Sequence, residues 1–175
     1  MAGLGPAAAE PVADALRARL AAPAADGALY APELLRALYA GRDFAPLWMG
    51  GRAEEAQAAL AAAEAHGLST ANYHRAAIVS GRGDTTPGGQ AALDVLISDG
   101  LLLLGSHVRS GRIEPGSVTP RPRLLGVDAD LPARLAAAPS AAAFLDGLVS
   151  PLAGYARLQD ALRRYQALAD AGGWS

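Results

Sequence analysis

The sequence contains no cysteine among its 175 residues. This absence excludes disulfide bonds within the chain and any reaction for which the chain itself would supply a cysteine nucleophile. Aromatic residues make up only 5% of the sequence. Neither charge is in large excess, because the formal net charge is −2. The composition therefore gives no overall field that would attract nucleic acid or an anionic membrane, and we expect no nucleic-acid partner.

Long apolar runs are also missing. The longest purely aliphatic run, Leu101 to Leu104, is far shorter than the roughly 18 residues that cross a membrane, so we expect no membrane insertion. The first residues, Met1 to Pro6, lack the basic and apolar regions of a signal peptide. Composition leaves two interpretations open: a cytoplasmic protein, or a chain that begins just after a removed signal.

What the chain does contain favours helices. Apolar residues make up 51% of the sequence, and alanine, leucine and arginine are strong helix formers. We predict an all-α fold: a single bundle-like domain of about six to eight helices, with long loops rich in proline and glycine. The domain is expected to cover residues 9–175, after a disordered lead-in at residues 1–8. The expected helices begin near Glu10 and run over about 32–40, 52–66, 90–110, 131–138, 140–149 and 153–171, with a short helix containing Tyr73 and Ile78.

The segment from about Gln90 to Ser110 is the most apolar, and its leucine, isoleucine and valine residues cover well over half of a helix circumference. A helix that is apolar on most sides lies in the centre of a domain. Gly100 and Gly105 would each cost roughly 1 kcal/mol in a helix interior, so we interpret them as points where another helix approaches closely. The last helix carries Tyr155, Leu158, Leu162, Tyr165 and Leu168, which we expect on one face of that helix.

Side chains for catalysis or metal binding do not form a recognisable pattern. Ser106 lacks the glycine and the strand-to-helix turn of a nucleophile elbow. His66, His74 and His107 have no spacing typical of metal ligands. We therefore predict no catalytic residue, no metal site and no cofactor.

A basic segment extends from Arg109 to Arg123. Arg109, Arg112, Arg121 and Arg123 could bind carboxylates of a peptide or of a partner domain through paired hydrogen bonds. Alternatively, Arg109 and Arg112 satisfy the carbonyl groups at the end of the preceding helix and form ion pairs within the domain. We favour the second interpretation for these two residues, and both remain open for Arg121 and Arg123.

Four aromatic residues are also candidates for binding or domain docking. Phe44, Trp48 and Tyr73 could line a groove, but large rings in loops more often anchor a loop to the core, which is the interpretation that we favour. Trp174 follows the last helix almost immediately, so its packing partner could lie outside this chain.

Four motifs stand out from the background, and both tryptophans lie within them. They are Arg42-Asp43-Phe44-Ala45-Pro46-Leu47-Trp48, then His66-Gly67-Leu68 with Tyr73-His74, then His107-Val108-Arg109-Ser110-Gly111-Arg112 with Pro115, and finally Gly172-Gly173-Trp174. In this order and spacing the sequence resembles, from about Leu16 to Trp174, the N-terminal helical scaffold domain of the large YcbB-like L,D-transpeptidases. Ser69, Thr70 and Asn72 depart from the family pattern, which often has acids and a proline there.

The resemblance implies a non-catalytic scaffold in a periplasmic enzyme that cross-links peptidoglycan. Its implied partners are the catalytic and peptidoglycan-binding domains of the parent chain, and possibly peptidoglycan itself. The catalytic cysteine of such an enzyme would lie outside this chain. An alternative is a free-standing helical adaptor, or a module that binds peptide or murein through the Arg109–Arg123 loop and the aromatic motifs. An unrelated hydrolase is the third and weakest alternative.

Overall fold

A computed structural model describes residues 6–22, 29–112 and 129–173, and all the regular elements in these ranges are helical. The all-α prediction is therefore confirmed. The α-helices and the two short 3₁₀ helices, η1 and η2, are α1 (Pro6–Ala21), α2 (Pro32–Ala40), α3 (Gly51–Ala61), η1 (Ala62–His66), η2 (Thr70–Asn72), α4 (Arg75–Gly81), α5 (Pro87–Ser110), α6 (Leu131–Ala137), α7 (Ala141–Asp146) and α8 (Ala153–Asp170).

Helix α5 is the central element, as the sequence predicts. It begins at Pro87, three residues before Gln90, because the Thr86 hydroxyl caps it by accepting a hydrogen bond from the Gly89 amide at 3.1 Å. Every residue from Ile97 to Val108 is buried. By length and composition α5 could cross a membrane, but 83% of its most apolar window is buried by the rest of the chain. Burial of this kind is typical of a core helix.

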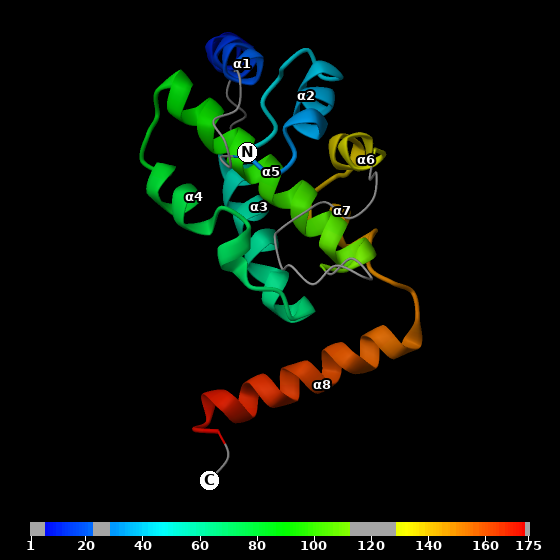
Figure 1. The fold of residues 1–175 in the computed structure, drawn as a ribbon. Coiled ribbons are helices and arrows are strands. Elements are labelled where there is room, and N and C mark those ends of the chain that lie inside the picture. Colours follow the sequence, from blue (N-terminus) through cyan, green and yellow to red (C-terminus); the bar gives the residue numbers. More distant parts are fainter. Residues whose placement is uncertain (1–5, 23–28, 113–128, 174–175) are drawn as a thin grey trace.

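Six other helices, α1, α2, α3, α4, α6 and α7, pack around α5 and form the helical body (Figure 1). The apolar stripes of these helices point at α5 and exclude water from it. The largest fully buried side chains of the body include Leu16, Leu35, Tyr39, Tyr73, Leu131 and Leu135. One continuous core therefore holds helices that lie far apart in the sequence.

Some boundaries differ from those predicted. Helix α1 begins at Pro6 rather than near Glu10, so residues 6–8 of the expected lead-in are helical. Tyr73 lies between η2 and α4 rather than inside one helix, because His74 adopts a left-handed conformation with φ of 55° and interrupts the helical path. Most of the expected loop at 113–130 lies outside the described residues.

Helix α8 stands apart from the helical body and contacts it through η1 (Figure 1). None of the residues from Ala153 to Asp170 is buried. The helical body covers only part of the expected apolar face: Tyr155 and Leu162 face η1, whereas Leu158 is 71% exposed. The physical reason is the helical rotation of about 100° per residue, which spreads this apolar set over two adjacent faces, and the body covers only one.

Candidate functional site

The best-defined polar arrangement is a set of buried side chains on α5 that hold the loops of the helical body. Asp94 is 1% exposed, and its carboxylate accepts hydrogen bonds from the backbone amides of Trp48 at 2.7 Å and Leu47 at 3.1 Å. The Tyr39 hydroxyl also donates to Asp94. These bonds satisfy amide groups that a buried loop cannot give to water. One carboxylate therefore fixes the Pro-Leu-Trp segment of the first motif.

Ser98, one helical turn after Asp94, completes this arrangement. Its hydroxyl accepts a hydrogen bond from the Trp48 indole Nε1 at 2.8 Å and lies 2.8 Å from the Tyr39 hydroxyl. The spacing i, i+4 places both α5 side chains on the face that receives the loop. Trp48 is thus held by its backbone and by its ring, and it is 5% exposed.

Burial shifts the pKa values of the two ionisable groups in this arrangement, Asp94 and Tyr39. Desolvation raises the pKa of the Asp94 carboxyl above its ordinary value, while the hydrogen bonds from Tyr39, Trp48 and Leu47 oppose that rise. Burial, and next to it the neighbouring Asp94, raise the pKa of the Tyr39 phenol well above its ordinary value. Both groups are used as fixed hydrogen-bond partners of the loop.

A second buried acid, Asp99, holds the second motif and the start of α2. It is fully buried and accepts hydrogen bonds from the backbone amides of Tyr30 at 2.8 Å and Ala31 at 2.9 Å. The His74 Nε2 atom lies 2.6 Å from the same carboxylate, and the His74 ring stacks on Tyr30 with ring centres 4.6 Å apart. The left-handed backbone of His74 is therefore held by the contact of its ring with a buried carboxylate.

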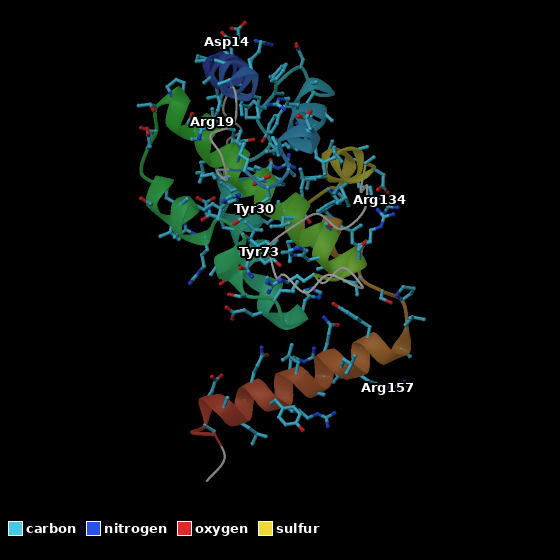
Figure 2. The ribbon with its side chains drawn as sticks, in the orientation of Figure 1. Asp14, Arg19, Tyr30, Tyr73, Arg134 and Arg157 are labelled. Carbon is cyan, nitrogen blue, oxygen red and sulfur yellow. The ribbon has the colours of Figure 1, made fainter. Side chains whose placement is uncertain are left out.

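Tyr73 connects the second motif to the third. Its hydroxyl lies 3.0 Å from Nδ1 of His107, and the two rings meet edge to face with centres 5.8 Å apart. Tyr73 is 1% exposed, whereas Tyr30 is partly buried; both are labelled in Figure 2. Burial raises the pKa of the Tyr73 phenol to about 12, so the hydroxyl stays protonated at physiological pH.

The two glycines in α5 mark close contacts, as the sequence predicts. A Cβ atom on Gly100 would lie 3.1 Å from the backbone oxygen of Tyr73. A Cβ atom on Gly105 would lie 2.9 Å from both Leu148 Cδ1 and the Phe144 ring. A Cβ atom at Gly105 would therefore require its neighbours to shift, and one at Gly100 would make an unusually tight contact.

The predicted aromatic residues occupy different environments. Trp48 and Tyr73 are buried in contacts within the domain, which is the anchoring arrangement. Phe44 is partly buried, has a left-handed φ of 58°, and lies under the Arg17 guanidinium at 4.9 Å. Their role in binding a partner stays a prediction. Trp174 lies outside the described residues.

Two of the four predicted arginines, Arg109 and Arg112, lie within the described residues, and both line the same cleft. Arg109 forms an ion pair with Asp130 at 2.7 Å, and Arg134 binds the other oxygen of the same carboxylate at 2.7 Å. These two guanidinium groups lower the pKa of Asp130. Arg112 is half-buried and lines the cleft where α8 joins the helical body. Arg121 and Arg123 lie outside the described residues. A carboxylate-binding role for the four arginines stays a prediction.

A cleft of about 330 Å³ lies where α8 joins the helical body. It brings together residues of the second and third motifs and of the closing helix, which are far apart in the sequence. Its polar and aromatic lining includes His66, His107, Arg112, Ser150 and Tyr155. The arrangement offers hydrogen-bond donors and one half-buried guanidinium, and it can accept a carboxylate or another small anion.

The polar contacts at this junction attach α8 to η1. The Tyr155 hydroxyl lies 2.7 Å from Nδ1 of His66, and the Gln159 amide lies 3.2 Å from the same atom. Gln159 and Gln166 also donate to the backbone oxygens of Ala65 at 3.4 Å and Glu64 at 3.2 Å. Two glutamines thereby satisfy carbonyl groups near the end of a short helix. We name the Tyr155, Gln159 and Gln166 contacts with η1 the α8 clasp.

Burial lowers the pKa of the His66 imidazole, and the nearby Asp146 partly opposes this effect. The neutral ring is also the form whose Nδ1 atom can accept a hydrogen bond from Tyr155 or Gln159. The α8 clasp is therefore built around a neutral histidine.

Residues that could hold a metal are not grouped in the part of the chain that the structure describes. No cluster of three or more histidine, aspartate or glutamate side chains with metal-binding geometry occurs there. The buried acids Asp94 and Asp99 are instead surrounded by hydrogen-bond donors from loops.

The comparisons with known proteins agree with this arrangement of motifs on a central helix. The family model described as "Scaffold domain" matches residues 33–162. The chain belongs to the scaffold-domain family. The match runs from the first turn of α2 to the middle of α8, so it includes α5 and the segments around Trp48 and His74 that α5 holds. Neither a curated protein nor a solved structure matches the chain.

Sequence reasoning missed the residues that hold the scaffold domain together. Asp94, Ser98 and Asp99 received no role, although all three are buried and bind the loops. A signal was present, because two acids and a serine interrupt the apolar surface of a predicted core helix, and a buried acid needs partners. Their partners are mainly backbone amides, which no sequence motif identifies.

Proposed function

We propose that this scaffold domain is the non-catalytic support of a peptidoglycan L,D-transpeptidase. In this proposal another domain of the same polypeptide supplies the cysteine thiolate for acyl transfer between stem peptides. The scaffold packs against that domain and helps to position it on the cell wall, which places the protein in the periplasm. The chain itself contributes shape and rigidity.

One observation carries the proposal. Three of the four motifs that resemble the scaffold of YcbB-like enzymes fall within residues 33–162, the range matched by the scaffold-domain family, which ends in the middle of α8. The closing Gly172-Gly173-Trp174 motif follows that range. Within the matched range, Asp94, Asp99 and His107 of α5 each bind a side chain or a backbone amide of another motif or loop.

The chemistry of the site supports the same conclusion. The buried side chains of Asp94, Ser98 and Asp99 are engaged with backbone amides or with other side chains, and their geometry serves to fix loops. A scaffold domain is by its description a non-catalytic unit, and this chain contains no cysteine. Acyl transfer through a thiolate therefore requires a residue that this chain does not supply.

The activity of the full gene product tests the proposal. We expect the reading frame that encodes this chain to encode a cysteine-containing domain, and the purified product to cross-link disaccharide-tetrapeptide substrates. The 175-residue chain alone should transfer no acyl group under the same conditions. Acyl transfer by the chain alone, or a gene product without any thiol-dependent activity on these peptides, would overturn the proposal.

A matched pair of variants tests the supporting role. Asp94→Ala in the full product removes the buried acceptor that holds Trp48, so the scaffold should loosen and cross-linking should fall. Asp160→Ala changes an exposed acid of α8 and should leave cross-linking unchanged. Equal activity of both variants, with Asp94→Ala shown to be destabilised, would argue against a supporting role.

A further inference from the structure

The outer side of α8 carries an apolar stripe that the helical body does not cover. The members of this stripe, which we name the outer stripe, are Leu158, Ala161, Tyr165 and Leu168. Leu158 is 71% exposed, Tyr165 is 60% exposed and Leu168 is 45% exposed. Their spacing of three, four and three residues places them on one face of the helix. Large exposed apolar groups in one row mark an interaction surface.

Charge borders the outer stripe on its open edge. Arg157 and Arg164, seven residues apart, lie beside the stripe on the edge that faces away from η1, since each helical residue turns the side chain by about 100°. Figure 2 labels Arg157 on α8. The acid of this region, Asp160, lies further round and pairs with Arg163 on the polar side. The open edge of the stripe is therefore basic.

The apolar outer stripe and its basic edge favour one kind of binding partner over two others. A second copy of the chain fits poorly, because an antiparallel pair of outer stripes would bring the Arg164 side chains of the two copies close together on the same edge. An anionic membrane is also disfavoured, because α8 has three arginines against two aspartates, and the electrostatic attraction is only about 1 kcal/mol per basic residue near such a surface. A helix with carboxylates beside its own apolar row complements both the leucines and the arginines.

The size of the stripe indicates how the occupant is held. Leu158 to Leu168 spans about 15 Å, or roughly three turns of helix. A contact of this length covers less than the roughly 1,000 Å² that a stable association between separate proteins needs. Tethering removes this limit, because two sites in one polypeptide meet at a high effective concentration.

We propose that the outer stripe of α8 is the docking surface for an amphipathic helix with acidic residues along its apolar edge, located in the neighbouring catalytic domain of the same polypeptide. This inference rests on the proposed function, which supplies that neighbouring domain. The α8 clasp holds one side of the helix against η1, and the docked helix covers the other. Helix α8 then lies between the scaffold and the domain that it supports.

The test follows the leucine methyl groups of this chain by NMR while the remainder of the encoded polypeptide, produced separately, is added. We expect the methyl signals of Leu158 and Leu168 to shift and those of buried Leu101 to stay in place. The double variant Leu158→Glu with Leu168→Glu should weaken binding at least about tenfold, since both side chains would lie at the centre of the contact. Val79→Glu, at a 54% exposed position on α4, is the matched control and should leave binding unchanged.

Charge reversal tests the chemistry of the partner. Arg157→Glu with Arg164→Glu should weaken binding about threefold or more, and added salt should weaken wild-type binding. Arg163→Glu, which alters the polar side, should have no effect. Binding that ignores the outer stripe, or that Val79→Glu weakens equally, would overturn the inference.

Two further outcomes would assign the stripe to another occupant and so also overturn it. One is self-association of this chain that Leu158→Glu abolishes, measured by sedimentation equilibrium. The other is binding to phosphatidylglycerol vesicles that Leu158→Glu abolishes. Failure of the proposed function is recognised separately: if the separate remainder shows thiol-dependent acyl transfer but leaves the methyl signals unmoved, only the docking inference fails.

Discussion

The backbone amide of Trp48 donates a hydrogen bond of 2.7 Å to the carboxylate of Asp94, which lies 46 residues later in the chain. Through this bond the loop after α2 is fastened to the middle of the central helix. The indole of Trp48 donates a hydrogen bond to Ser98 one turn further along α5, and this second contact fixes the position of the loop along the helix axis. Helix α5 thus binds the motif around Trp48 through backbone amides as well as through the indole side chain.

Asp94→Ala tests this relationship. The substitution leaves two buried amides without their acceptor and removes one of the partners of the Tyr39 phenol, so we expect the free energy of unfolding to fall by about 3 kcal/mol. Asp94→Asn keeps one acceptor oxygen and should lose less. Urea unfolding followed by tryptophan fluorescence measures both. Asp160→Ala, at an exposed acid, should change the value by less than about 0.5 kcal/mol, and a similar loss in both alanine variants would contradict the assignment.

A methyl group at Gly105 is expected to lower the free energy of unfolding. Gly105→Ala places a Cβ atom 2.9 Å from Leu148 and Phe144, so we expect a net loss of about 1–2 kcal/mol even though alanine is the better helix former. Gly154→Ala is the matched control, because it lies in α8 with nothing within 4 Å of the added atom. It should stabilise the protein by up to about 1 kcal/mol. Thermal unfolding that ranks the two variants in the opposite order would refute the close-contact interpretation.

The α8 clasp is expected to open independently of the helical body. Gln159→Ala with Gln166→Ala removes two bonds to the carbonyl groups of η1, while α8 itself has no buried residue to lose. Hydrogen exchange of the α8 amides should therefore quicken, and the melting temperature should change by less than about 2 °C. Arg157→Ala, on the far side of α8, serves as the control. A large drop in melting temperature would mean that α8 is part of the cooperative core.

His66 is expected to make stability depend on pH. Its folded pKa is lowered, so the neutral ring is favoured in the folded state. The contribution of His66 is therefore fully present above its ordinary pKa of 6.5 and is lost as pH falls through the lower folded value. Urea unfolding from pH 8 to pH 5 should show a shallower dependence in His66→Gln than in the wild type. Parallel curves, or a steeper curve for the variant, would exclude this role.

Several features of the fold could be predicted from local pattern alone. The apolar circumference of α5 predicted a central helix, and Gly100 and Gly105 predicted close contacts, because both arguments depend only on residue type and helical periodicity. The position of Pro32 at the start of α2 was predicted for the same reason. The candidate site was less accessible, since the partners of Asp94 and Asp99 are backbone amides from distant loops.

The sequence by itself determined an all-helical domain with a buried central helix, because helix propensity and apolar periodicity are properties of neighbouring residues. Only the tertiary structure decided that α8 stands apart and keeps Leu158 and Leu168 exposed. An apolar stripe in a sequence indicates that another structural element packs on it, but not whether that element belongs to the same domain. The exposure of Leu158 and Leu168 depends on how many faces of α8 the helical body contacts, and it contacts one.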